Sequence, residues 1–196
     1  MNSLIIDTST KFLYIALVKE EAVLSEKIFE GSKNHAGNSV YQINEMWHEH
    51  NLKASDIDNV YCGYGPGSYT GVRISVTIAK MLASFQNTKL YKVSSLFLAG
   101  SGYDNKNVAV MFDARRGNSF CACFGETIIC DKLRSNEEFL QSVNNLEDVI
   151  VVNEANFKVN PLKVIANSEL VTEVESFVPN YLRIVEAEYN LEHKND

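Results

Sequence analysis

Gly65-Pro66-Gly67-Ser68-Tyr69-Thr70-Gly71 joins a short apolar segment, Asn59–Gly63, to a helical pattern that runs to Phe85. Glycines permit tight backbone turns, and a helix start presents free N–H groups, so such a loop can hold a phosphate. Alternatively, the glycines only let the chain turn sharply and let the helix pack close to the sheet, since the loop lacks a P-loop lysine and G-x-G-x-x-G spacing. The candidate phosphate-binding residues are Gly65, Gly67, Ser68, Thr70 and Gly71, together with Asp7, Thr8 and Ser9 of an earlier turn.

The helix after this loop divides into three stripes when it is wound at about 100° per residue. The bulky stripe is Ile74, Ile78, Met81 and Phe85, the small stripe is Val72, Val76, Ala79 and Ala83, and the polar stripe is Arg73, Thr77, Lys80 and Ser84. One apolar stripe can cover the domain's own sheet, while small side chains suit close contact with a second helix in a partner. The alternative, that both stripes are buried inside one domain, stays open.

An earlier predicted helix, Ser39–His50, carries an apolar stripe and large side chains typical of interfaces. We therefore expect a protein-docking surface made by the two helices. Its candidate residues are Val40, Ile43, Met46, Trp47, Val72, Val76, Ala79, Lys80 and Ala83.

Two lobes are predicted from the order of the apolar segments. Strands at 3–7, 12–18, 23–29, 59–63 and 89–93, with helices between the later ones, make one mixed-sheet domain over residues 1–102. Strands at 108–113, 119–124, 127–131 and 149–152, with a helix at 136–143, indicate a smaller, partial second lobe over 103–196, and its end is expected to be loose.

Composition limits the function classes. The 196 residues are 45% apolar, enough for real cores, and the formal charge of −7 without a basic stripe opposes direct nucleic-acid binding. No leader or membrane-spanning run is recognisable. The four cysteines form no zinc-type spacing, and the four histidines suggest no metal site. We expect a reduced, cytoplasmic protein that binds no metal.

Two polar turns carry alternatives of their own. Asp7-Thr8-Ser9-Thr10 could organise magnesium through water, or could consist of ordinary turn formers. Asp113-Ala114-Arg115-Arg116-Gly117 places paired arginines that can clamp a carboxylate or phosphate, or that form a solvated hairpin tip. No nucleophile–base pair can be identified from the serine, cysteine and histidine positions.

Five segments taken in order resemble the TsaB (YeaZ) family. They are Ile6–Ser9, Gly65–Arg73, Val93–Leu96, Asp113–Arg115 and Pro179–Arg183. The resemblance implies an α/β fold of the actin/Hsp70-like (ASKHA, ribonuclease H-like) kind, with a mixed sheet, flanking helices and a shortened second lobe. It also implies a role in making threonylcarbamoyladenosine in tRNA, next to the anticodon.

The same resemblance implies a catalytically inert relative of TsaD that acts as a scaffold. TsaD-like chains have two metal-binding histidines where Ser95 and Ala99 stand here, and Asp7-Thr8-Ser9 lacks the glycine of an Asp-x-Gly phosphate turn. Implied partners are a TsaD-like protein and a TsaE-like ATPase, with a homodimer when the chain is alone and only indirect tRNA contact. No cofactor is implied, except ATP or ADP within a complex. The alternatives are a nucleotide-dependent phosphotransferase or ATPase using Asp7, and a metallopeptidase.

Overall fold

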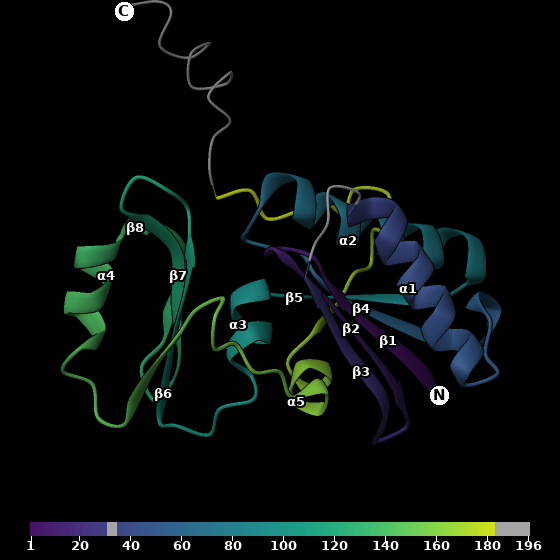
Figure 1. Ribbon diagram of the computed structural model, residues 1–196, viewed down its shortest axis with the longest axis horizontal. Helices are drawn as coiled ribbons and strands as arrows, with labels where there is room; N and C mark the ends of the chain where they lie inside the picture. Colours follow the sequence, from purple (N-terminus) through teal and green to yellow (C-terminus); the bar gives the residue numbers. More distant parts are fainter. Residues whose placement is uncertain (31–34, 183–196) are drawn as a thin grey trace, which may run out of the picture.

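The computed structural model describes residues 1–30 and 35–182, which form two sheets with helices on their faces (Figure 1). The larger sheet has the order β10-β5-β4-β1-β2-β3 and the smaller one β8-β7-β6-β9. The strands are β1 Asn2–Asp7, β2 Phe12–Lys19, β3 Ala22–Glu30, β4 Asn59–Gly63, β5 Lys89–Val93, β6 Asn107–Asp113, β7 Asn118–Gly125, β8 Ile129–Ser135, β9 Val149–Val152 and β10 Glu169–Leu170. The helices are α1 His35–Glu49, α2 Tyr69–Gln86, α3 Ser95–Gly100, α4 Asn136–Val143 and α5 Pro161–Ala166, and a 3₁₀ turn covers Ala54–Asp56.

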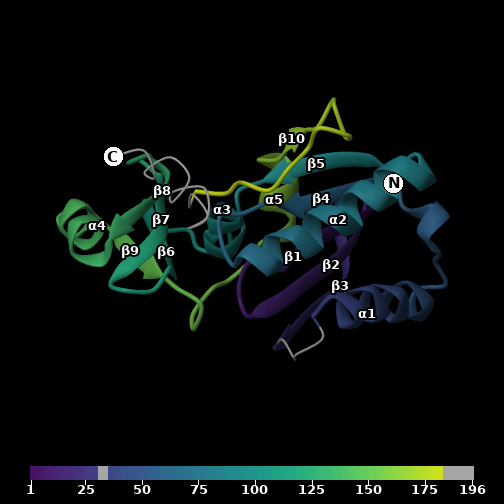
Figure 2. The same cartoon turned by 90° about the horizontal axis from the view of Figure 1, so that it is seen from above.

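The larger sheet is buried on both faces at its centre. β1 pairs antiparallel with β2 and parallel with β4, and both β1 and β2 are runs of buried apolar residues. On one face, α1 and α2 pack over Leu4, Ile6 and Leu17. On the other face, α3 and α5 pack over Ile5 and Ala16, and Figure 2 shows the sheet lying between these two helical layers.

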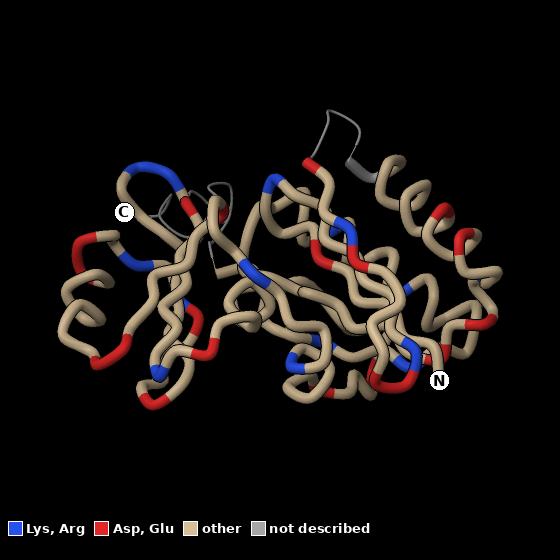
Figure 3. The backbone as a smooth tube through the Cα atoms, turned by 60° about the horizontal axis from the view of Figure 1, so that its bottom comes forward, with Lys and Arg blue, Asp and Glu red and all other residues tan. Residues whose placement is uncertain are grey.

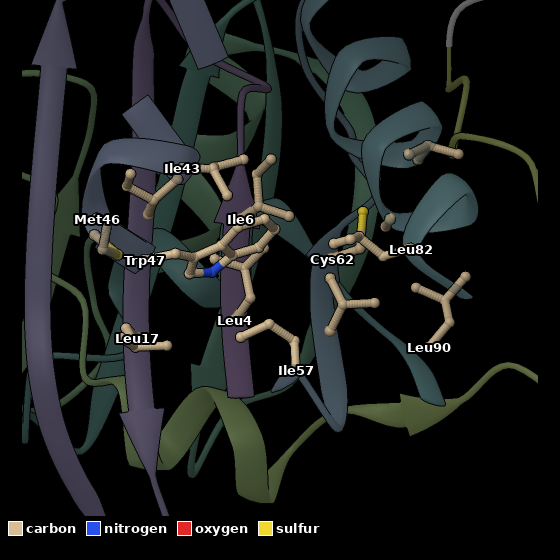
Figure 4. Close-up of a cluster of buried hydrophobic side chains, with 14 of the residues drawn as sticks. Leu4, Ile6, Leu17, Ile43, Met46, Trp47, Ile57, Cys62, Leu82 and Leu90 are labelled. Carbon is tan, nitrogen blue, oxygen red and sulfur yellow. The ribbon is translucent and has the colours of Figure 1, made fainter. Parts of the chain in front are cut away.

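The largest core cluster lies under α1. Trp47 points from this helix toward Leu4 and Ile6 of β1, and Met46 lies in the same cluster on the side of Leu17, as Figure 4 shows. Trp47 is 7% exposed and Met46 is fully buried. Burying side chains of this size stabilises the fold by about 1.5–3 kcal/mol each, so these residues belong to the subunit's own core.

Helix α3 is the layer that the two sheets share. Its Leu98 packs in the core of the larger sheet, whereas Leu96 and Ala99 pack against Val110 and Ala122 of the smaller sheet. The far face of the smaller sheet is covered by α4 through Phe139. The lobes are therefore joined by a common apolar helix.

The chain returns to the larger lobe after β9, which corrects the predicted extent of the second lobe. α5 packs in the larger lobe through Val164, β10 pairs with β5, and the segment 171–182, called here the strap, runs beside α2. Phe177 of the strap is buried against α2, and this apolar burial overrides the polar character of the region. The expected loose end, residues 183–196, lies outside the described residues.

The predicted strands and helices up to residue 152 are present, with shifts at some ends. β8 covers Ile129–Ser135 where the sequence pattern gave 127–131, and α1 begins at His35 where it gave Ser39. α5 and β10 were not predicted, because a six-residue helix and a two-residue strand carry too few residues for a periodic signal.

We expect Phe177→Ala to lower the free energy of unfolding by about 3 kcal/mol, because it leaves a cavity between the strap and α2. The matched control is Val178→Ala at the next position, where the side chain is 63% exposed and the change is expected to be under about 0.5 kcal/mol. Urea unfolding of both variants measures the difference. Equal effects at the two positions would show that the strap does not seal the core.

Candidate functional site

Asp7 lies at the end of β1, and both of its carboxylate oxygens accept hydrogen bonds. One carboxylate oxygen, Oδ1, accepts from the backbone N–H of Ser9 at 2.7 Å and from its hydroxyl at 2.6 Å. The other, Oδ2, accepts from the Ser95 hydroxyl at 2.5 Å. The residue is 5% exposed. Because Asp7 is buried and both of its oxygens accept hydrogen bonds, it is poorly placed to hold the water-bridged magnesium ion that the sequence allowed.

Burial raises the pKa of the Asp7 carboxyl above its ordinary value, and hydrogen bonds from Ser9 and Ser95 oppose that rise. Burial also raises the pKa of the neighbouring Cys62 thiol, and the charge of Asp7 adds to this rise. A thiol held in its neutral form is a poor nucleophile. Cys62 therefore lacks the lowered pKa of an activated nucleophile.

The glycine loop packs directly on the Asp7–Ser9 turn. The Ser68 N–H donates to the Ser9 carbonyl at 2.6 Å, and the Thr8 hydroxyl donates to the Gly71 carbonyl at 2.6 Å. A Cβ at Gly71 would lie 1.9 Å from the Thr8 carbonyl oxygen, and one at Gly67 would lie 2.4 Å from the Ser9 carbonyl oxygen. Glycine is therefore required at both positions because the two backbones approach closely. This agrees with the interpretation that the glycines serve packing.

The eight predicted phosphate-binding residues separate into two groups. Ser9, Gly67, Ser68 and Thr70 line a cleft of about 920 Å³ between the lobes, whose opposite wall includes Arg115 and Arg116. The other four lie beneath the cleft surface and are buried. These buried members are Asp7, Thr8, Gly65 and Gly71.

The small stripe of α2 faces inward, which corrects the predicted docking surface. Val72, Val76 and Ala79 are at most 3% exposed. Val76 and Ala79 pack in the core that the strap seals, and Ala83 is partly buried against the same core. The Lys80 ammonium donates to the carbonyls of Glu175 and Phe177, at 2.7 and 2.9 Å. The strap of the same chain thus covers the small stripe of α2, which was expected to bind a partner.

The predicted residues of α1 are corrected in the same way. Ile43, Met46 and Trp47 are buried in the subunit's own core, because the sheet beneath α1 supplies the apolar surface that they need. Val40 alone among the predicted α1 residues is exposed, at 57%, and its neighbour Tyr41 is exposed to the same extent.

The bulky stripe of α2 faces outward. Met81 is 56% exposed and Phe85 is 77% exposed, while Ile74 and Ile78 are half-buried. The sequence alone could not show which of the two stripes stays exposed. The strap that covers the small stripe lies about 100 residues further along the chain. We use the name outer face for the exposed residues of the two helices, Val40 and Tyr41 on α1 with Met81 and Phe85 on α2, and these are the candidate docking residues.

Ser95 and Ala99, at the positions of the TsaD-type histidines, have structural partners. Ser95 donates to Asp7 and accepts from the Gly65 N–H at 3.0 Å, and Ala99 is buried between α3 and the smaller sheet. Within residues 1–30 and 35–182, no cluster of three or more His, Cys, Asp or Glu side chains could hold a metal ion. In the same part of the chain, no helix combines the length and apolar character that crossing a membrane requires.

A family model described as "TsaD: tRNA N6-adenosine threonylcarbamoyltransferase" matches residues 23–148. Proteins called tRNA threonylcarbamoyladenosine biosynthesis protein TsaB are similar over larger or smaller parts of the chain. The one from Bacillus subtilis is 29% identical over 221 residues, which cover 96% of each protein. The one from Escherichia coli is 32% identical over 127 residues, which cover 62% of this chain and 54% of the relative.

The chain belongs to the TsaB/YeaZ family, a relative of TsaD. The solved structure of YeaZ from Pseudomonas aeruginosa superimposes with a TM-score of 0.72 at 21% identity, covering 92% of this chain and 99% of that one. A second structure from P. aeruginosa, of a protein described as similar to peptidase YeaZ, gives a TM-score of 0.76 at 21% identity. It covers 93% of this chain and 99% of that one. The predicted mixed α/β fold of this TsaB-family chain is thereby confirmed, and it is the fold of the YeaZ structures.

We expect Gly71→Ala to lower the free energy of unfolding by about 2 kcal/mol, because the new methyl group overlaps the Thr8 carbonyl oxygen. Alanine is otherwise the better helix residue by about 1 kcal/mol, so the sign of the change tests the close contact. The control is Thr70→Ala, an exposed position in the same helical turn. A more stable Gly71→Ala variant would contradict the packing described here.

The pKa of Asp7 predicts a pH dependence of stability. Because burial raises this pKa above 3.8, the folded state binds more protons than the unfolded state between 3.8 and the raised value. The free energy of unfolding of the wild type, minus that of Asp7→Asn, should therefore fall as the pH rises through this range and then level off. Urea unfolding of both proteins at a series of pH values measures it, and a difference that grows with pH would refute the assignment.

Proposed function

We propose that this TsaB-family chain is a non-catalytic subunit that docks onto a TsaD-like threonylcarbamoyltransferase and activates it for tRNA modification beside the anticodon. The observation that carries the proposal is the outer face of α1 and α2. In this arrangement the chain acts in the cytoplasm, a TsaE-like ATPase joins the same assembly, and tRNA is contacted through the partner.

The outer face has the chemistry of an interface. Phe85 and Met81 leave more than half of their surface in water on consecutive turns of α2, and Val40 and Tyr41 do so on α1, which packs on the same side of the sheet. Aromatic residues and methionine are enriched at the centres of interfaces. Covering one such side chain is worth about 1.5–3 kcal/mol, and a few anchors of this kind carry most of the energy of an interface.

The absence of a catalytic role is supported by what occupies the positions expected for chemistry. The Asp7 carboxylate is satisfied by Ser9 and Ser95, and the glycine loop is closed on the turn that follows β1. Ala99 has only a methyl group where a TsaD-like chain has a metal ligand. Each residue contributes to packing instead of to a reaction.

The two enzymatic alternatives have direct tests. An ATPase of this fold would need Asp7 to be accessible, so ATP turnover by the purified chain that is lost in Asp7→Ala would replace the scaffold proposal. A metallopeptidase would need a metal, so stoichiometric zinc or iron in the purified full chain would have the same consequence. We expect neither activity nor metal.

Indirect contact with tRNA is supported by the distribution of charge. The chain carries 18 Lys and Arg residues against 25 Asp and Glu residues, and Figure 3 shows the basic positions scattered among acidic ones over both lobes. A phosphate backbone is repelled at long range by such a surface. A partner with its own basic surface would supply the tRNA contacts.

We expect Phe85→Arg and Met81→Arg each to weaken binding to the TsaD-like protein by at least about 2 kcal/mol, which is roughly 30-fold, because a charge replaces an apolar anchor in the buried interface. Both side chains are exposed, so the isolated variants should unfold like the wild type. Co-purification and the threonylcarbamoyladenosine content of tRNA in cells carrying each variant measure the effect.

Ile128→Arg is the matched control. Ile128 is 77% exposed, as Phe85 is, but lies in the smaller lobe, between β7 and β8. The control should bind like the wild type. Full binding and full modification by Phe85→Arg and Met81→Arg together would show that the outer face is not the docking surface. A homodimer formed by the chain alone through this face should be lost in the same two variants.

A further inference from the structure

Two arginines are held in an unusual backbone conformation at the turn between β6 and β7. Arg115 and Arg116 have φ values of 68° and 56°, in the left-handed region that side chains other than glycine seldom adopt. The turn is fastened by Asp113, whose Oδ1 accepts from the Arg115 N–H at 2.8 Å, and by the Ala114 N–H, which donates to the Asn118 carbonyl at 2.9 Å. The sequence pattern singles out this arginine pair, and the docking function does not use it.

Both arginines line the cleft of about 920 Å³ between the lobes. Within residues 1–30 and 35–182, neither guanidinium group has an ion-pair partner or a side-chain hydrogen bond. The facing wall supplies the exposed hydroxyl groups of Ser68 and Thr70, whereas the Ser9 hydroxyl is already committed to Asp7. The cleft thus offers uncommitted cationic groups on one side and neutral donors on the other.

We propose that this cleft binds a small phosphate-bearing molecule, held by the guanidinium groups of Arg115 and Arg116 without a metal ion. A guanidinium group presents its N–H donors in a planar fork that matches two phosphate oxygens at once. The hydroxyl groups across the cleft donate to the remaining oxygens, and the first turn of the 18-residue helix α2 lies on the same wall.

The binding mode differs from one built on the glycine loop. That loop is closed on the Asp7–Ser9 turn, and both oxygens of the buried Asp7 carboxylate already accept hydrogen bonds. Recognition therefore comes from side chains of the smaller lobe, and the ligand's charge is met by arginine instead of by magnesium.

Two carboxylates limit the charge that the cleft accepts. Asp113 is fastened to its own turn, whereas Glu154 lines the cleft without such a bond, and burial raises the pKa of its carboxyl. Lys11 also lines the cleft and is bonded to Glu30 at 3.2 Å. Glu154 therefore opposes an anion in the cleft, so Glu154→Gln should strengthen its binding.

Nonspecific electrostatic attraction cannot explain anion binding, because the protein as a whole carries a formal charge of −7. An anion that binds must be held by a local arrangement of donors. Binding should weaken with added salt, as expected for contacts between phosphate and exposed cations.

The test is calorimetric titration of the full chain with inorganic pyrophosphate in the presence of EDTA. We expect saturable binding below about 1 mM, weakened at least about tenfold in the double variant Arg115→Ala/Arg116→Ala. The charge-matched control is Lys19→Ala/Lys132→Ala, which removes two exposed lysines outside the cleft and should bind within about twofold of the wild type. Glu154→Gln should bind more tightly.

A second variant distinguishes a loss of the binding groups from a loss of folding. Arg115→Lys/Arg116→Lys keeps both charges and loses the planar forks, so it should show an intermediate affinity. Absence of wild-type binding, an equal loss in the lysine control, or binding that appears only with magnesium would each overturn the proposal.

Parallel titrations with ADP and citrate identify the ligand class. Tighter binding of ADP than of pyrophosphate would assign the site to a nucleoside diphosphate. Equal or weaker binding would assign it to the phosphate group alone. Citrate that binds as well as pyrophosphate would overturn the phosphate assignment. None of these outcomes depends on whether the chain docks to a TsaD-like protein.

Discussion

The hydrogen bond between the Asp7 carboxylate and the Ser95 hydroxyl joins the first strand to α3, across 88 residues of sequence. Asp7 ends β1, Ser95 begins α3, and the same hydroxyl accepts from the Gly65 N–H at the start of the glycine loop. A Cβ at Gly63 would overlap the carboxylate, so β4 must also end in a residue without a side chain. Because α3 packs between the two sheets, this buried carboxylate positions the loop and the smaller lobe together.

The cost of burying that carboxylate explains why it is surrounded by hydrogen-bond donors. A buried charge is stable only when it is fully hydrogen-bonded, and the partners here are Ser9 and Ser95. Both oxygens of the carboxylate are thus used to hold the turn after β1 and the start of α3 in place.

The sequence predicted most of this architecture and less of its surfaces. Alternation and 3.6-residue periodicity located the strands and helices up to residue 152, since those signals are local. The sequence could not predict which stripe of α2 faces the core, because both of its long stripes are apolar. The strap decides it: Phe177 seals Val76 and Ala79, and Lys80 fixes the strap through two of its carbonyls.

The same limit explains the mixed outcome at the glycine loop. Spacing identified a loop that needs glycine but could not distinguish a phosphate cradle from close backbone packing, because the Thr8 and Ser9 carbonyl oxygens that fill the space come from an earlier turn. The paired arginines were equally ambiguous until the fold placed their turn on the wall of the cleft.

Helix α2 belongs to both surfaces of the molecule. Its first turn forms one wall of the cleft, and its last two turns carry Met81 and Phe85 on the outer face. Between them, Arg73 stacks 3.9 Å above the Tyr69 ring and donates to the Tyr181 hydroxyl at 2.7 Å, which ties the end of the strap to the helix. Energetic coupling needs a contiguous element that both sites contact, and α2 with its strap is such an element. An anion in the cleft and a protein on the outer face would therefore act on one helix, whose position is set by the core beneath it.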